Sequence, residues 1–548
     1  MVEKFFDFGG IDFYIMIILA VFNAYLIMKF LNRGMVALQL DEYKNKRYFC
    51  YLFKSLYQYF GGAIYIFALS VLFAICVTLV FNLFSIGIVF SFVSVVCYLY
   101  LMLDFIEKEE KLNQSGLRKS KLNFTKRLKR LYFLAFLINF IATFALLRFS
   151  CMYVSFLGYG AISFSILLAF IILPFANLIL KPFEWAVYMH YIKLAKKKLN
   201  DYPNLIKIAI TGSYGKTSTK FILHKLLSEN FKVCTSPNSF NTPMGLTKVI
   251  LNNLQPYNDV LLVEMGANEK NDIKKLCDFI NPQIGIVTAI GNAHLKTFKT
   301  KENLIKTKFQ LVESVERFGR GGFMAFNADN AGSSEFYSKC SCDKCEVSCK
   351  QFGVDVFAIN VAYSEKGVSF TLCTQSGKVD CKTKLVGKHN IENILLASSV
   401  ALKLGVELRT VAKLINQLEP IKHRLELRAD GEHFVLDDSF NSNQVGFVNA
   451  LEVLSFFKGK KIVVTPGIVE LDKDAYNSNY YVATKIASVA DVCIIVNKEN
   501  EKALSDGLGQ KIKVYKAQSF NEAMNILNDE IEVDACVLFE NDLPDNYV

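Results

Sequence analysis

Residues 206–219 read IKIAITGSYGKTST, a short apolar run that leads into two glycines and then into Lys216, Thr217, Ser218 and Thr219. The apolar run predicts a buried strand, and the amphipathic stretch Phe221–Leu227 predicts a helix after the turn. A turn between a strand and a helix presents main-chain N–H groups and the positive end of a helix dipole to phosphate oxygens. The stretch therefore predicts an ATP site.

Within this stretch we expect a continuous set of residues to hold the nucleotide. They are Gly212, Ser213, Tyr214, Gly215, Lys216, Thr217 and Ser218. Lys216 would reach the outer phosphates, and the Thr217 hydroxyl would hold Mg²⁺. The spacing is shorter than in the common phosphate loop, because Ile210 stands where the first glycine would be.

Length and composition divide the chain in two. Its 548 residues are enough for several domains, and the hydrophobic fraction of 52% is high for a purely soluble enzyme. The excess lies before about residue 200, and the remainder resembles an ordinary α/β protein. The 14 cysteines follow no secreted-domain pattern, which favours free thiols in a reducing compartment. The net charge of +11 lies largely beside apolar runs, which argues against a nucleic-acid partner.

Residues 1–200 contain five apolar stretches, each about 20 residues long, the length that crosses a bilayer. They are Ile11–Leu31, Gly62–Phe84, Ile86–Leu103, Leu131–Leu147 and Tyr153–Leu180. Lys and Arg concentrate after the first and third stretches, which predicts that these connections face the cytoplasm, with the N-terminus outside. We therefore expect an all-α transmembrane region with the lipid bilayer as a partner and the phosphate turn on the cytoplasmic side.

Residues 201–428 alternate apolar runs with helical stretches, the pattern of a parallel sheet covered by helices. Ligands of such sheets bind beyond the carboxyl ends of the strands. Glu264 ends one predicted strand and His294 follows the next, so we expect both to join Thr217 as Mg²⁺ ligands. For Glu264 alone, a solvated strand end is the simpler interpretation. Residues 429–548 repeat the alternation and predict a smaller Rossmann-like α/β domain.

Eight motifs follow one another in the order found in the Mur ligases. They are TGSYGKTST, SFNTPMGL (239–246), VEMGAN (263–268), GNAHL (291–295), NADN (327–330), GKHNIEN (387–393), HRLE (423–426) and DDSFNSN (437–443). The resemblance covers about residues 203–500 and implies a P-loop central domain followed by a C-terminal α/β domain. Within the family the motifs are most similar to those of the branch that adds D-alanyl-D-alanine to a UDP-muramoyl-tripeptide in bacterial peptidoglycan synthesis.

The resemblance implies a metal centre with two Mg²⁺ sites. Glu264 and His294 would bind metal. Lys308, in IKTKFQ, stands where these enzymes carry a lysine whose amine is carbamylated. Carbon dioxide would turn this cation into a carboxylate able to hold a second Mg²⁺. Gln310 occupies a position that is often Glu in the family, which is a departure from the pattern.

The resemblance also implies nucleotide contacts. Asn327 would lie near the adenine. Asp438 would contact the ribose or align Asn443 toward the reacting phosphate. Arg424 would join Lys216 and the metal ions in neutralising phosphate charge. The expected catalytic set is thus Lys216, Lys308, His294 and Arg424.

The chemistry implied is phosphoryl transfer from ATP to a carboxylate, followed by attack of an amine on the acyl phosphate to give an amide. The family's N-terminal UDP-binding domain is not visible before Pro203. At the other end of the chain, FENDLPDNY (539–547) replaces the usual C-terminal sequence of the family. The acceptor is therefore left open between a UDP-linked and a lipid-linked muramoyl peptide. A ligase adding glutamate or another amino acid to a different surface polymer, and a non-catalytic nucleotide-binding membrane scaffold, are the alternatives. The leading expectation is a multi-pass protein of the bacterial inner membrane with its catalytic domains in the cytoplasm.

KCSCDKCEVSCK places Cys340, Cys342, Cys345 and Cys349 within ten residues. Four thiolates so close in sequence could hold zinc or an iron–sulfur cluster. The spacing is not a standard zinc pattern, and in a helix the four sulfurs could not converge. The alternative is a surface insert of reduced thiols.

Overall fold

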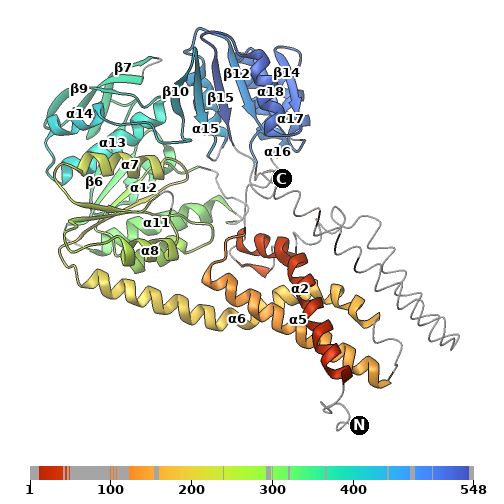
Figure 1. Ribbon diagram of the computed structural model, residues 1–548. Coiled ribbons are helices and arrows are strands. Elements are labelled where there is room, and N and C mark those ends of the chain that lie inside the picture. Colours follow the sequence, from red (N-terminus) through yellow and green to blue (C-terminus); the bar gives the residue numbers. More distant parts are fainter. Residues whose placement is uncertain are drawn as a thin grey trace. The chain divides into compact units, whose positions relative to one another are not determined.

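The structure is a computed structural model that describes residues 11–40, 43–45, 48–49, 99, 103, 107, 122–153, 160–237, 240–291, 298, 300–318, 321–364, 367–440, 443–469, 475–496 and 498–541. It divides into two compact units (Figure 1). The first contains the residues up to Val187, and the second is Tyr188–Leu543.

The first unit is helical, because its sequence consists of long runs of Leu, Ile, Phe and Ala with few breakers. Its helices are α2 (Ile11–Leu40), α5 (Lys126–Tyr153) and α6 (Gly160–Asn200) as far as Val187. Helices α2 and α5 pack against each other, and in their interface the Asn23 amide donates to Thr143 Oγ1 at 3.0 Å. Arg130 binds Glu184 with two hydrogen bonds of 2.7 and 2.9 Å, which tie α5 to α6.

The expectation of five membrane spans is not confirmed. Among the residues described, two helices are long and apolar enough to cross a membrane, Lys126–Arg148 and Ile171–Asn200, and Phe13–Lys29 is shorter. The expected spans Gly62–Phe84 and Ile86–Leu103 lie outside the described residues, apart from isolated positions. Two such helices are weak support, because a buried core helix passes the same test. The described residues therefore do not confirm a multi-pass membrane region.

The second unit holds two sheets, as the predicted α/β class requires. The first has nine strands in the order β2-β3-β1-β4-β5-β6-β7-β8-β9. Their bounds are β1 Ile206–Thr211, β2 Val233–Thr235, β3 Val260–Glu264, β4 Ile284–Val287, β5 Phe323–Asn327, β6 Asp343–Ser348, β7 Val356–Ser364, β8 Gly367–Thr374 and β9 Gly377–Thr383. The strands from β2 to β7 run parallel, whereas β7, β8 and β9 are antiparallel hairpins.

Helices cover both faces of this sheet (Figure 1). They are α7 Lys216–Leu227, α8 Pro243–Asn252, α9 Asp272–Ile280, α11 Lys301–Phe318, α12 Ala331–Lys339, α13 Lys388–Lys403 and α14 Leu408–Asn416. Strand alternation sends Ile208 and Ile210 into the core with α7 and α13, whereas Ala209 packs in the core beneath α8, α9 and α11. Burial on both faces explains why β3 reads as an unbroken apolar run up to Glu264.

The second sheet has six strands in the order β10-β11-β15-β12-β13-β14, and all its neighbours are parallel except β10 and β11. The strands are β10 Glu426–Asp430, β11 His433–Asp438, β12 Lys461–Thr465, β13 Val492–Val496, β14 Lys513–Ala517 and β15 Cys536–Glu540. The helices are α15 Gln444–Leu454, α16 Ala475–Val489, α17 Glu501–Leu508 and α18 Phe520–Glu530. Parallel strands joined through helices on both faces are the arrangement that the alternating sequence pattern predicts.

Candidate functional site

The glycine turn, residues 212–215, connects β1 to α7. Gly215 has φ 79° and precedes the first helical residue, Lys216. A Cβ at Gly215 would lie 2.6 Å from Asn393 Oδ1, and one at Gly212 would lie 1.9 Å from Thr288 Oγ1. Both positions therefore require glycine, and the chain passes close to its neighbours there. The result is a compact turn at the N-terminus of a 12-residue helix, the geometry that binds anions.

Two oxygen ligands meet at the start of α7. The Thr217 hydroxyl donates to Glu264 Oε2 at 2.8 Å, and both side chains are buried. Asn241 Nδ2 donates to the other carboxylate oxygen, Oε1, at 3.3 Å. Glu264 is the last residue of β3, the neighbour of β1, so the shared carboxyl edge of the parallel sheet brings these groups together. Threonine and glutamate oxygens are suitable Mg²⁺ ligands.

Two lysine amines converge on the glycine turn. Lys216 Nζ donates to the carbonyl oxygen of Gly212 at 2.9 Å, and Lys308 Nζ donates to the same oxygen at 2.8 Å. Burial lowers the pKa of the Lys308 amine well below its usual value, and the positive charge of Lys216 lowers it further. Burial also lowers the pKa of Lys216, although the charge of Glu264 opposes the shift. The turn thus holds one amine that loses its proton easily beside the lysine expected to reach phosphate.

Lys308 lies on α11, far from the turn in sequence, and is 4% exposed. Gln310, where the related enzymes often have Glu, instead donates from Nε2 to Asn271 Oδ1 at 2.7 Å at the start of α9. The predicted ligand His294 lies outside the described residues.

Helix α13 links Asn327 to the same region. Asn327, at the end of β5, donates from Nδ2 to Glu392 Oε2 at 2.9 Å. The next residue, Asn393, accepts from the Thr219 hydroxyl of α7 at 3.0 Å. Burial raises the pKa of the Glu392 carboxyl, and the hydrogen bond from Asn327 opposes that shift. The predicted adenine contact thus lies in a polar network that reaches α7.

The segment before β10 and the end of β11 place the C-terminal candidates. Arg424 lies over the ring of Phe440, with 4.3 Å between the guanidinium carbon and the ring centroid. Burial lowers the pKa of Arg424, while the negative charges of Glu264 and Asp438 favour its charged form. Asn443 caps α15 by accepting from the N–H groups of Val445 and Gly446. Arg424 is thus electrostatically linked to the metal-ligand candidate Glu264, whereas Asn443 has a structural role in the described contacts.

Asp438 gives a pH-dependent prediction. Burial raises the pKa of this carboxyl to about 7, although the N–H of Leu425 donates to Oδ1 at 3.0 Å. Between about pH 4 and pH 7 the folded chain therefore keeps a proton that the unfolded chain has released, so this group's contribution to stability falls as pH rises. The side chain of the Asp438→Asn variant does not titrate. We therefore expect the melting temperature of the variant, minus that of the unchanged chain, to be higher at pH 8 than at pH 5. Thermal melts of both proteins without nucleotide measure this difference in melting temperature. A difference that is the same at pH 5 and pH 8 would refute the prediction.

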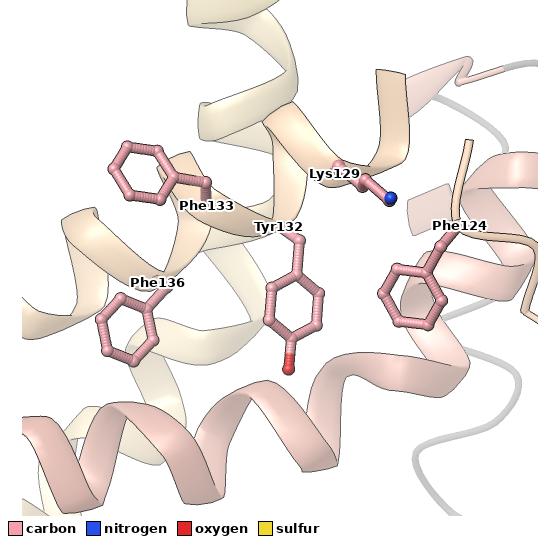
Figure 2. A pocket seen from close by; sticks show the side chains of 5 residues that line it. All are labelled: Phe124, Lys129, Tyr132, Phe133 and Phe136. Atoms are coloured by element: carbon pink, nitrogen blue, oxygen red, sulfur yellow. The ribbon is translucent and has the colours of Figure 1, made fainter. Parts of the chain in front are cut away.

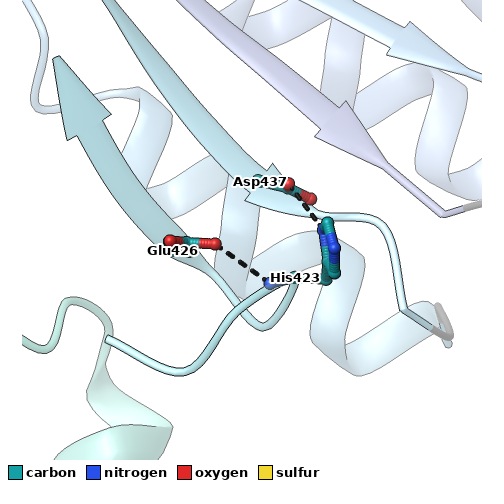
Figure 3. Close-up of side chains that lie close together, drawn as sticks. All are labelled: His423, Glu426 and Asp437. Atoms are coloured by element: carbon teal, nitrogen blue, oxygen red, sulfur yellow. Dashed lines mark hydrogen bonds and ion pairs between the residues drawn. The ribbon is translucent and has the colours of Figure 1, made fainter. Parts of the chain in front are cut away.

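Sequence reasoning missed the grouping of His423, Glu426 and Asp437 (Figure 3). Their ligating atoms lie within 4.8 Å of one another, the one such group of three or more among the described residues. His423 Nδ1 lies 2.8 Å from Asp437 Oδ2, and the His423 main-chain N–H donates to Glu426 Oε2 at 3.1 Å. Asp437 Oδ1 also accepts from the Ser439 hydroxyl at 2.6 Å. Because these carboxylates are already engaged by protein donors, the group holds the segment before β10 against β11.

Lys220 is a second residue that sequence reasoning missed. It lies one helical turn after Lys216, has no exposed surface, and donates from Nζ to the carbonyl and hydroxyl oxygens of Ser236 at 2.8 and 3.2 Å. Burial lowers its pKa to about 8. Ser236 directly follows β2, so Lys220 fixes α7 to the end of that strand. No local pattern marks this lysine, because in sequence it resembles a surface lysine of the helix.

We expect Lys220→Met to destabilise the chain by about 1–3 kcal/mol, because the buried Ser236 carbonyl loses its charged donor. Urea unfolding at pH 7 measures the loss. Lys225→Met, on the partly exposed side of the same helix, is the matched control and should change stability far less. Equal stabilities of the two variants would contradict the role given to Lys220.

The cysteine-rich segment is not helical beyond its first residue. Cys340 follows the end of α12, and Cys345 lies in β6. Within the described ranges these four thiols form no group of three or more within ligating distance of one another. The structure therefore gives no support to a metal site formed by these four thiols.

The first unit has a cavity whose lining differs from that of the candidate nucleotide site (Figure 2). Phe124, Lys129, Tyr132, Phe133 and Phe136 line it, all on α5 or just before it. Its lining is mostly aromatic carbon and has no carboxylate, so it lacks the ligands that a Mg²⁺–nucleotide site requires.

Comparison with known proteins supports the assignment of the turn. Residues 210–401 match the Mur ligase middle domain. The UDP-N-acetylmuramoyl-tripeptide–D-alanyl-D-alanine ligase of Escherichia coli K12 is 27% identical over 307 residues, which are 55% of this chain and 67% of that enzyme. The enzyme of that name from Mycobacterium tuberculosis H37Rv is 31% identical over 252 residues, 45% of this chain and 48% of the relative. The chain therefore spans between about half and two thirds of these relatives.

Solved structures show the same fold. A crystal structure of MurF from Acinetobacter baumannii aligns with a TM-score of 0.59 at 24% identity, covering 65% of this chain and 77% of that one. MurF from Thermotoga maritima, solved in complex with ADP, aligns with a TM-score of 0.57 at 23% identity, covering 65% and 80%. These relatives are ligases. In this chain, only two helices among the described residues are long and apolar enough to cross a membrane. The two findings together overturn the predicted multi-pass membrane localisation.

Proposed function

We propose that this chain, which belongs to the Mur ligase family and is an ATP-dependent amide ligase, adds D-alanyl-D-alanine to a muramoyl-tripeptide in peptidoglycan synthesis. The observation that carries the proposal is the buried contact of 2.8 Å between Thr217 and Glu264 at the glycine turn, with the Lys308 amine on the Gly212 carbonyl. The names of the curated relatives supply the substrates.

The residues present fit Mg²⁺. Thr217 and Glu264 offer two buried hard oxygens, and Asn241 keeps the carboxylate oriented. These two side chains would hold the ion, and His294 is a further candidate from the sequence. When bound, Mg²⁺ would neutralise charge on the phosphate oxygens.

The buried Lys308 amine is suited to carbamylation. A neutral amine is the form that reacts with carbon dioxide, and burial beside Lys216 favours that form. The carbamate would exchange a cation for an anion next to a site that holds divalent metal. Lys308 would then act as a further metal ligand, as the family resemblance implies.

The protein's own groups would act mainly by positioning and by charge. The glycine turn and the N-terminus of α7 would cradle the β- and γ-phosphates of ATP, with Lys216 neutralising the charge that develops. A substrate carboxylate would attack the γ-phosphorus and release ADP, giving an acyl phosphate. The amine of D-alanyl-D-alanine would then displace phosphate to form the amide. Arg424 would add positive charge, Asn327 would contact the adenine, and Asp438 the ribose.

An ADP-release assay on the purified chain tests the proposal. The acceptors are UDP-muramoyl-tripeptide and a lipid-linked muramoyl peptide, and the amines are D-alanyl-D-alanine and glutamate, each pair run with and without the amine. The proposal expects amine-dependent ADP release with D-alanyl-D-alanine. Release with glutamate alone would favour the ligase of another polymer, and no amine-dependent release from folded protein would contradict catalysis.

A further inference from the structure

The thiols of Cys340 and Cys342 lie side by side. Their sulfur atoms are 3.4 Å apart, close enough for one thiol to donate a hydrogen bond to the other. Cys340 follows α12 and its N–H donates to the Phe336 carbonyl at 3.0 Å, while Cys342 precedes β6. A disulfide requires about 2.05 Å between the sulfurs, so a small movement would join them.

Contacts on both sides fix the short loop that carries the two thiols. Ser341, between them, donates from its N–H and its hydroxyl to Glu316 Oε1 at 2.7 and 2.9 Å. Lys344 Nζ donates to the carbonyl oxygens of Cys340 and Tyr337, both at 2.9 Å. The loop therefore holds the two sulfur atoms close together.

The two thiols of the pair differ from each other in acidity. The pKa of the Cys340 thiol is lowered, because the Cys342 thiol donates a hydrogen bond to the thiolate, while the pKa of Cys342 is raised for the same reason. Burial instead raises the pKa of Cys345 and of Cys349, to about 12 for Cys345. One member of the pair is thus the more readily ionised thiol and the other keeps its proton beside it, the arrangement of an attacking and a resolving cysteine.

Cys342 is also partly exposed, whereas Cys340 is 4% exposed. The pair lies at the amino end of β6. Thr217 and Glu264 lie at the opposite, carboxyl edge of the same parallel strands, since β6 runs parallel to β5. Chemistry at the pair is therefore separate from the glycine turn.

We propose that Cys340 and Cys342 form a redox-active dithiol that a hydroperoxide converts into an intramolecular disulfide. The Cys340 thiolate attacks one oxygen of hydrogen peroxide, the O–O bond breaks, and hydroxide leaves and is protonated to water. The Cys340 sulfenic acid is then attacked by the sulfur of Cys342, which gives up its proton, and the S–O bond breaks with release of a second water. Two thiols lose two electrons in total, and one peroxide is reduced to two waters.

Peptide mapping of the full chain tests this directly, because Lys339, Lys344 and Lys350 separate the cysteines. Trypsin yields CSCDK with Cys340 and Cys342, and CEVSCK with Cys345 and Cys349. The reduced chain is treated with hydrogen peroxide, then alkylated and digested. We expect CSCDK to lose two hydrogens and to resist alkylation until a dithiol reductant is added, while CEVSCK keeps two alkylatable thiols. Full alkylation of CSCDK after peroxide, or equal oxidation of the two peptides, would overturn the proposal.

Variants separate the roles of the two sulfurs. Cys342→Ser removes the resolving thiol, so Cys340 should accumulate as a sulfenic acid that reacts with dimedone. Cys345→Ser is the matched control and should leave disulfide formation unchanged. If the Cys345→Ser variant no longer formed the disulfide within CSCDK, the pairing of Cys340 with Cys342 would be contradicted. Circular dichroism of each variant establishes that it is folded.

Discussion

Lys216→Ala abolishes ligase turnover in our account, with a fall of about 10³-fold or more in the rate of ADP release. Lys216 is the first residue of α7, and its amine already lies over the turn, 2.9 Å from the Gly212 carbonyl oxygen. Removing it takes away the positive charge closest to the expected γ-phosphate and leaves the helix intact. The rate of amine-dependent ADP release, measured with saturating substrates, gives the loss.

The matched control is Lys225→Ala on the same helix, which should retain most of the activity. Circular dichroism and thermal melts should show both variants folded, because Lys216 contributes no apolar packing to the core clusters. If Lys216→Ala kept substantial turnover, the glycine turn would not be the phosphate site.

Lys308→Ala is the second variant with a large expected effect, a loss of about 10²–10³-fold in turnover. The substitution removes two things at once. One is the metal-binding carboxylate that a carbamate on Lys308 would supply, and the other is the amine that donates to the Gly212 carbonyl oxygen. Short carboxylic acids such as acetate or formate can supply the missing carboxylate. We therefore expect them to restore part of the activity in a concentration-dependent way.

Two controls separate rescue from a general salt effect. Acetate should not restore Lys216→Ala, and chloride at equal ionic strength should not restore Lys308→Ala. A fully active Lys308→Ala would remove the carbamate from the mechanism. Loss of activity with no response to any carboxylic acid would give Lys308 a structural role through Gly212.

The phosphate turn could be predicted because its conformation is encoded locally. Gly212 and Gly215 are required by a close approach and a positive φ, and the strand and helix on either side have clear periodicities. Glu264 could be placed because parallel strands share a carboxyl edge, and the contact with Thr217 has the geometry that this argument expects.

Other features depend on contacts that no local pattern specifies. Lys220 resembles a surface helix lysine in sequence, and only the return of the chain at Ser236 buries it. The raised pKa of Asp438 depends on burial among residues from separate segments. The grouping of His423 with Asp437 depends on the pairing of β10 with β11.

The localisation of the chain as a multi-pass inner-membrane protein is overturned, and it rested on hydropathy and length alone. Hydropathy and length measure only how apolar a helix is, and they do not distinguish lipid from protein as its surroundings. In helix α2, Leu26, Ile27 and Leu31 are buried in a cluster with residues of α5 and α6, whereas Ile15, Ile18 and Phe22 are exposed.

The central claim is that Thr217 and Glu264 hold a divalent ion beside a nucleotide at the glycine turn. Crystals of the chain grown with ADP and Mn²⁺, measured at the manganese absorption edge, test it most directly. We expect an anomalous peak within bonding distance of the Thr217 hydroxyl and the Glu264 carboxylate, with the diphosphate on the main-chain N–H groups of residues 212–217. A nucleotide bound away from this turn, or manganese coordinated elsewhere while Thr217 still donates to Glu264, would contradict the claim.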